Sequence, residues 1–150
     1  MNVSQLMSDE EDNKFFSKIT LDYSPTIFGE PMPLLKVGFK SLPQPLLALV
    51  DSGATSSMLN PTIADALKLK INYNTKKLGT GAGGTFEYVH SEPVEVEILG
   101  QKYMVGFNIM LDNNFAWTCI LGHNSIFKFA KIVFKSYKKQ FDIFLRKDIN

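Results

Sequence analysis

The segment 46–55 constrains the fold of this chain more than any other part of the sequence. It reads Leu-Leu-Ala-Leu-Val-Asp-Ser-Gly-Ala-Thr, so five apolar residues lead directly to the carboxylate of Asp51. Five residues are too few for a helix, and a segment rich in branched side chains predicts a strand that is buried on both faces. Gly53 then permits a sharp turn of the backbone. A carboxylate at the end of an apolar strand is costly unless it is bound or used, so Asp51 is a candidate functional residue.

A purely local role explains the same residues. Asp51 can accept hydrogen bonds from the backbone of its own loop, as an Asx turn does. The three letters Asp-Ser-Gly do not distinguish this role from a functional one, so the choice depends on the rest of the chain.

Composition excludes several classes of protein. The 150 residues suffice for one domain with a substantial core, and a net charge of +1 gives no reason to expect nucleic acid or an anionic membrane as a partner. No apolar run is long enough to span a bilayer. Cys119 is the only cysteine, which excludes an internal disulfide, and the two histidines, His90 and His123, come without a cysteine cluster. We therefore expect neither a metal nor a cofactor.

The N-terminal residues 1–17 are polar and acidic, so they do not resemble a secretory signal, and we expect a cytoplasmic protein. A polar tail is one interpretation of this segment. A short helix that begins with a capping box of Ser8 and Glu11 is the other, and the sequence does not choose between them. The remaining residues, 18–150, are interpreted as one domain.

Alternation of apolar and polar residues predicts a mainly β domain. Strands are expected at 18–23, 34–39, 46–50 and 118–122, with hairpins over 92–107 and 131–145. Asn60 and Pro61 are typical of a helix start, so a short helix is expected from 61 to about 68. Lysines gather near the last hairpin, at positions 128, 131, 135, 138 and 139. We interpret them as a solvated sheet edge in preference to a nucleic-acid surface.

The glycine-rich segment 79–84 matches the pattern G-x-G-x-x-G of dinucleotide-binding proteins. That mechanism requires a helix directly after the glycines. Here Thr85, Phe86, Tyr88 and Val89 follow, and these residues favour a strand. The segment is therefore better interpreted as the flexible tip of a β-hairpin, whose backbone amides can approach a ligand.

Three short motifs now stand in an informative order. They are Val50-Asp51-Ser52-Gly53-Ala54, then Gly81-Ala82-Gly83-Gly84, and finally Ile120-Leu121-Gly122. Together they resemble the active-site loop, the flap tip and the apolar-apolar-Gly strand of the retropepsin-like aspartic proteases, and the resemblance extends over residues 34–145. It implies a single-domain closed β fold (an acid-protease half-barrel) with one or two short helices, active as a homodimer.

Two positions depart from the viral enzymes of that family. Thr55 and His123 stand where those enzymes commonly carry an acidic residue and an arginine. Both halves of that ion pair are replaced together, which indicates a different way of securing the loop. The chain looks closer to the cellular, bacterial and retrotransposon-type members.

The resemblance also implies roles for individual residues. Asp51 would form a catalytic dyad with its symmetry mate, Ser52 would lock the two loops across the dimer, and Gly53 would offer its amide to the carboxylate. The expected substrate is a peptide or protein. The residues expected to contact it are Ala54, Thr55, Gly81, Ala82, Gly83, Gly84 and Leu121. The rival hypothesis is a catalytically idle, dimeric peptide-binding module on the same fold.

Overall fold

The computed structural model describes residues 16–112 and 115–146. The predicted tail over 1–17 and the alternative helix capped by Ser8 lie outside these residues, apart from Phe16 and Ser17, which begin the first strand. By its internal contacts the chain divides into a central unit, Leu34–Ile126, and a terminal unit, Met1–Pro33 with Phe127–Asn150. Whether the two form one domain over 18–150 stays a prediction.

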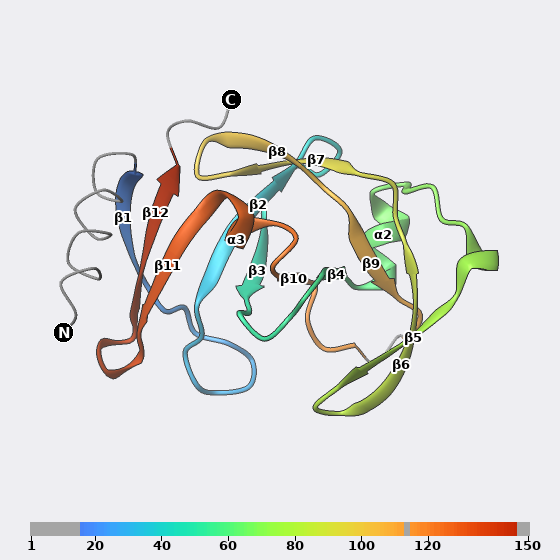
Figure 1. Ribbon diagram of the computed structural model, residues 1–150, viewed down its shortest axis with the longest axis horizontal. Helices are drawn as coiled ribbons and strands as arrows, with labels where there is room; N and C mark the ends of the chain where they lie inside the picture. The colour runs from blue at the N-terminus through green and yellow to red at the C-terminus, as the bar shows by residue number, and fades with distance from the viewer. Residues whose placement is uncertain (1–15, 113–114, 147–150) are drawn as a thin grey trace, which may run out of the picture. The chain divides into compact units, whose positions relative to one another are not determined.

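The described residues form strands joined by short helices, and the prediction of a mainly β chain is confirmed (Figure 1). The elements are β1 (Phe16–Asp22), β2 (Leu34–Phe39), β3 (Leu46–Val50), β4 (Ser57–Leu59), α2 (Pro61–Ala66), η1 (Tyr73–Thr75), β5 (Lys77–Gly81), β6 (Gly84–His90), β7 (Val94–Ile98), β8 (Gln101–Val105), β9 (Phe107–Met110), β10 (Cys119–Leu121), α3 (Ile126–Phe129), β11 (Ala130–Lys135), η2 (Ser136–Lys138) and β12 (Gln140–Arg146).

The central unit holds one sheet with the strand order β5-β6-β9-β4-β10-β3-β2-β7-β8. Its middle is made by short strands from distant parts of the sequence. β10 runs parallel to β3 on one side and antiparallel to β4 on the other, and β4 runs parallel to β9. β3 and β4 therefore lie on opposite sides of β10, and the segment that joins them passes around β10.

Strand β3 is less buried than its composition predicts. Ala48, Leu49 and Val50 are buried, whereas Leu46 is half-buried and the Leu47 side chain is 46% exposed. The prediction of burial on both faces is thus wrong for the first two residues. Leu46 and Leu47 pair with β2 alone, whereas β10 pairs with Leu49 and Val50. The buried end is the one that leads to Asp51.

Helix α2 begins where the sequence predicts. The Asn60 side chain accepts a hydrogen bond from the Thr62 N–H at 2.8 Å, and Pro61 occupies the first turn, where its missing N–H costs nothing. The predicted hairpin over 92–107 is confirmed as β7 and β8, which turn through Leu99 (φ 51°) and Gly100 (φ 77°). Two residues with positive φ match the right-handed twist of the paired strands.

The terminal unit contains a three-stranded antiparallel sheet with the order β1-β12-β11. The hairpin of β11 and β12 confirms the prediction for 131–145. Its central strand buries Phe141, Ile143 and Leu145, and with them Asp142, which is only 2% exposed. Lys135 forms an ion pair with Asp142 at 2.6 Å. The interpretation of the lysines as a solvated edge is therefore wrong for Lys135, which neutralises a buried carboxylate.

Candidate active site

Asp51 lies at the carboxyl end of β3, in a tight turn. The Gly53 N–H donates to Asp51 Oδ1 at 2.8 Å, and the Ala54 N–H donates to the Asp51 carbonyl at 3.2 Å. The Asp51 side chain is half-buried, and Ser52 and Gly53 are exposed. The turn thus holds one carboxylate oxygen through a backbone amide and leaves the group in reach of a ligand. The sequence-predicted trio of Asp51, Ser52 and Gly53 is brought together here.

Strand β10 and the residues after it hold this turn in place. The Asp51 N–H donates to the Leu121 carbonyl at 3.1 Å, and the His123 N–H donates to the Ala54 carbonyl at 2.9 Å. Between them, Gly122 packs so closely that a Cβ atom there would lie 2.6 Å from the Ala54 oxygen and 2.8 Å from the Ser56 carbonyl group. The apolar-apolar-Gly motif therefore ends in glycine because the loop backbone occupies the place of a side chain.

A cluster of buried polar groups supports the turn through Gly122. The Ser57 N–H donates to Asn124 Oδ1 at 2.6 Å, and the Ser57 hydroxyl lies 2.8 Å from the same oxygen and 2.7 Å from the Ser125 hydroxyl. The Gly122 N–H donates to Ser57 Oγ at 3.0 Å. Ser57 and Ser125 are fully buried. Because every member is hydrogen bonded, the cluster fixes the position of the loop without an uncompensated cost.

Sequence reasoning did not find Ser57 or Ser125. A serine has no pattern of its own, and three consecutive polar residues after Ala54 look like ordinary loop. The available signal was Asn124, whose amide also donates to the Gly106 carbonyl at 2.8 Å and so joins β9 to the cluster.

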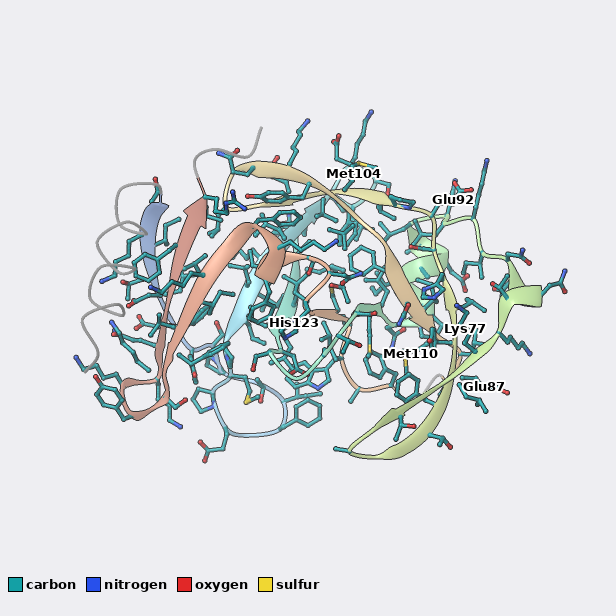
Figure 2. The ribbon with its side chains drawn as sticks, in the orientation of Figure 1. Lys77, Glu87, Glu92, Met104, Met110 and His123 are labelled. Atoms are coloured by element: carbon teal, nitrogen blue, oxygen red, sulfur yellow. The ribbon has the colours of Figure 1, made fainter. Side chains whose placement is uncertain are left out.

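His123 adds a second contact to the turn. Its Nε2 atom lies 2.6 Å from the carbonyl oxygen of Ser52, and Figure 2 shows the ring beside the segment that follows β3. Of the two positions where the chain departs from the viral enzymes, this one takes part in holding the loop. Thr55 is exposed.

The glycine-rich segment is a hairpin tip, as predicted. Strands β5 and β6 pair from Lys77 and Tyr88 to Gly81 and Gly84, and Figure 1 shows their tip extending beyond the neighbouring strands. At its base the ring of Phe86 lies over Gly79, where a Cβ atom would be 2.5 Å from the ring. A strand, and not a helix, follows the glycines, so the geometry of a dinucleotide site is absent from this segment.

A cavity of about 470 Å³ lies under this tip. Its walls are residues 81–86 of the hairpin on one side and, on the other, apolar side chains of the central sheet and the segment before β10. Those side chains are Met58, Met110, Phe115, Ala116, Trp117 and Ile120, with Asp112 at the edge. The predicted residues Gly81, Ala82, Gly83 and Gly84 line it, whereas Asp51 does not.

The remaining predicted contacts differ in access. The side chains of Ala54 and Leu121 are buried, and Leu121 meets the site through its carbonyl group. Their role in substrate binding stays a prediction, as does that of Thr55. Cys119 is also fully buried, and burial raises the pKa of its thiol far above the usual range, so it remains protonated.

The described residues contain neither a metal-binding cluster nor a helix that could span a membrane. Within residues 16–112 and 115–146 there is no group of three or more histidine, cysteine, aspartate or glutamate side chains arranged to bind a metal ion. The helices of the same residues are all too short or too polar to cross a membrane.

Comparison with known proteins agrees with this geometry. A family model of aspartyl proteases matches residues 36–122, which is more than half of the chain and falls within the central unit. No curated protein sequence matches the chain. The matched segment contains the Asp51 turn, the hairpin tip and β10. On this match, the chain belongs to the retropepsin-like aspartyl protease family.

Proposed function

We propose that the chain is an aspartic endopeptidase that cleaves extended peptide segments with a pair of Asp51 carboxylates, one from each subunit of a homodimer. The observation that carries the proposal is the Asp51 carboxylate, which lies at the end of β3 and accepts one hydrogen bond from the described residues, donated by Gly53. Its remaining acceptor sites are available to a water molecule or to a second carboxyl group.

The argument for a dimer begins with the number of motifs. Asp-Ser-Gly occurs once in the 150 residues, and the chemistry of this family requires two carboxyl groups. Two carboxylates a few ångströms apart cannot both ionise cheaply, so they share a proton. The ionised one acts as a base on a bound water molecule, and the protonated one polarises the peptide carbonyl. The resulting titration belongs to the pair.

The cavity supports a preference for apolar side chains. Trp117, Phe115 and Met58 offer apolar surface opposite the backbone of the hairpin tip. An extended peptide that paired with the hairpin would direct alternate side chains to one face. A large apolar side chain of the bound peptide fits this cavity best.

The test is hydrolysis of a diverse peptide library, with products identified by mass spectrometry. The wild-type protein is compared with Asp51→Asn at equal concentration and with equal thermal stability. We expect cleavage by the wild type, enriched for peptides that carry large apolar residues, and none by the variant. Equal cleavage by both proteins would refute the assignment of Asp51, and binding without cleavage by the wild type would favour the idle peptide-binding module.

The shared site is tested by dilution. Specific activity is measured over a concentration series beside the mass from sedimentation in the same buffer. Activity is expected to fall as the dimer dissociates, and a peptide inhibitor that spans both halves is expected to favour the dimer by mass action. Full activity of a sample shown to be monomeric contradicts the shared dyad.

A further inference from the structure

We propose that His123 is a positioning residue for Asp51, acting through the peptide unit between Ser52 and Gly53. The inference rests on the proposed function for its catalytic consequence. Its structural basis is independent of that function: His123 Nε2 lies 2.6 Å from the carbonyl oxygen of Ser52, and the N–H of the same peptide unit donates to Asp51 Oδ1 at 2.8 Å.

The chemistry of the acceptor fixes the state of the ring. A carbonyl oxygen only accepts hydrogen bonds, so Nε2 carries the proton in this contact. A neutral His123 is therefore the Nε2–H tautomer, and an imidazolium would donate from the same atom.

One rigid plane connects the two hydrogen bonds. The peptide unit is planar, so fixing its oxygen also fixes the direction of its N–H. A donor on the oxygen also polarises the amide, which strengthens the bond that the amide donates. His123 thus orients and strengthens the one hydrogen bond that Asp51 receives from its own turn.

The position of His123 suits this role because its own backbone is fixed. Its N–H donates to the Ala54 carbonyl, and the preceding Gly122 packs against the loop backbone. The ring therefore extends from a fixed backbone to the Ser52 carbonyl group, in the exposed part of the turn.

The first test does not depend on catalysis. Nitrogen-15 NMR of the two histidines of the full chain reports their neutral tautomers. We expect Nε2–H for His123. His90 is the matched control, because its Nε2 lies 3.5 Å from Lys77 Nζ, which only donates, so that His90 is expected to be the Nδ1–H tautomer. A neutral His123 protonated at Nδ1 alone would overturn the inference.

The second test compares His123→Leu with His123→Gln, which keeps a side-chain N–H donor. Loss of the donor should weaken the hydrogen bond that the Gly53 amide donates to Asp51. The readouts are faster hydrogen exchange at Gly53 and a changed chemical shift of its amide in nitrogen-15 NMR. His123→Gln should stay near the wild type in both, and so should His90→Gln. An unchanged exchange rate and amide chemical shift of Gly53 in a folded His123→Leu protein would refute the proposal.

The catalytic consequence follows from the same variants. One hydrogen bond of this kind corresponds to a loss of about tenfold in kcat for His123→Leu, with KM unchanged. The acidic limb of the kcat/KM profile should move to higher pH, since the ionised carboxylate has lost support. An equal fall for His123→Gln with an unmoved pH profile would indicate mere structural damage and contradict the inference. If the wild type cleaves no peptide, the proposed function fails, and the NMR measurements still decide the role of His123.

Discussion

Two carboxylates of this chain are held in opposite ways. Asp142, in the terminal unit, is 2% exposed and is surrounded by partners: Lys135 Nζ at 2.6 Å, Lys18 Nζ at 3.7 Å and the Thr20 hydroxyl at 2.8 Å. Asp51, in the central unit, is half-buried and accepts one hydrogen bond, from the Gly53 amide. No lysine or arginine of the described residues forms an ion pair with it.

The difference indicates that the Asp142 carboxylate has a structural role, whereas the Asp51 carboxylate is available to a ligand. A buried charge is tolerated only when cations and donors compensate it, and Asp142 has used its acceptor sites in this way. Asp51 keeps most of its sites unused although it follows a strand whose last three residues are buried. Asp51 is therefore the carboxylate that is available for the catalytic pair proposed above.

The largest expected effect is that Asp51→Asn abolishes activity and spares stability, whereas Asp142→Asn spares activity and lowers stability. Asp51→Asn should lower peptide hydrolysis by about 10⁴-fold and leave the free energy of unfolding nearly unchanged, because the turn keeps its backbone hydrogen bonds. Asp142→Asn should keep hydrolysis and lose about 2 kcal/mol of stability, because a charged hydrogen bond is lost. Steady-state kinetics and urea unfolding of both variants check this. A stability loss that is larger for Asp51→Asn would reverse the comparison.

The next effect concerns the segment that secures Asp51. Gly122→Ala places a Cβ atom 2.6 Å from the Ala54 oxygen, and because the obstacle is backbone, the loop itself must move. We expect a loss of about 3 kcal/mol in stability. Gly106→Ala is the matched control, because nothing lies within 4 Å of its added Cβ. Similar urea midpoints for the two alanine variants would show that the loop is not tightly packed on Gly122.

Much of this arrangement could be predicted from the sequence. The strand that ends at Asp51, the helix capped by Asn60, and the hairpins were predictable because alternation and turn residues act locally. What could not be predicted depends on distant partners. Lys135 meets Asp142 only because β11 and β12 pair in one register, and Ser57 meets Asn124 only because β4 lies beside β10. The exposure of Leu47 was missed because a run of apolar residues does not reveal along which part of its length a strand has a neighbour on both sides.

The ion pair of Asp142 should also make the stability of the protein depend on pH. The Lys135 side chain is the main cause that holds the pKa of Asp142 below its usual value, with burial opposing it and Thr20 and Lys18 assisting. A group whose pKa is lowered by folding contributes stability above its unfolded pKa and loses it as the pH falls through the folded value. Stability should therefore decline from about pH 4 downward.

The control for this decline is Lys135→Met, which removes the main cause of the lowered pKa. Its free energy of unfolding at neutral pH should be lower than that of the wild type, and its further loss between about pH 5 and pH 3 should be smaller. Urea unfolding at several pH values measures both quantities. An equal acid-induced loss in the two proteins would show that other carboxylates govern the acid response.

The smallest expected effect belongs to the second lysine at Asp142. The Lys18 Nζ atom is 3.7 Å from Asp142 Oδ2, and its side chain is 54% exposed, whereas that of Lys135 is 29% exposed. An exposed ion pair at that distance contributes about 0.5 kcal/mol, because water and salt screen it and the side chain loses freedom to form it. Lys18→Met should thus shift the urea midpoint far less than Lys135→Met, and 0.5 M salt should remove most of the shift. A loss of stability equal to that of Lys135→Met would mean that the two lysines compensate Asp142 as one unit. Neither the shorter distance nor the deeper burial of Lys135 would then decide which lysine holds the carboxylate.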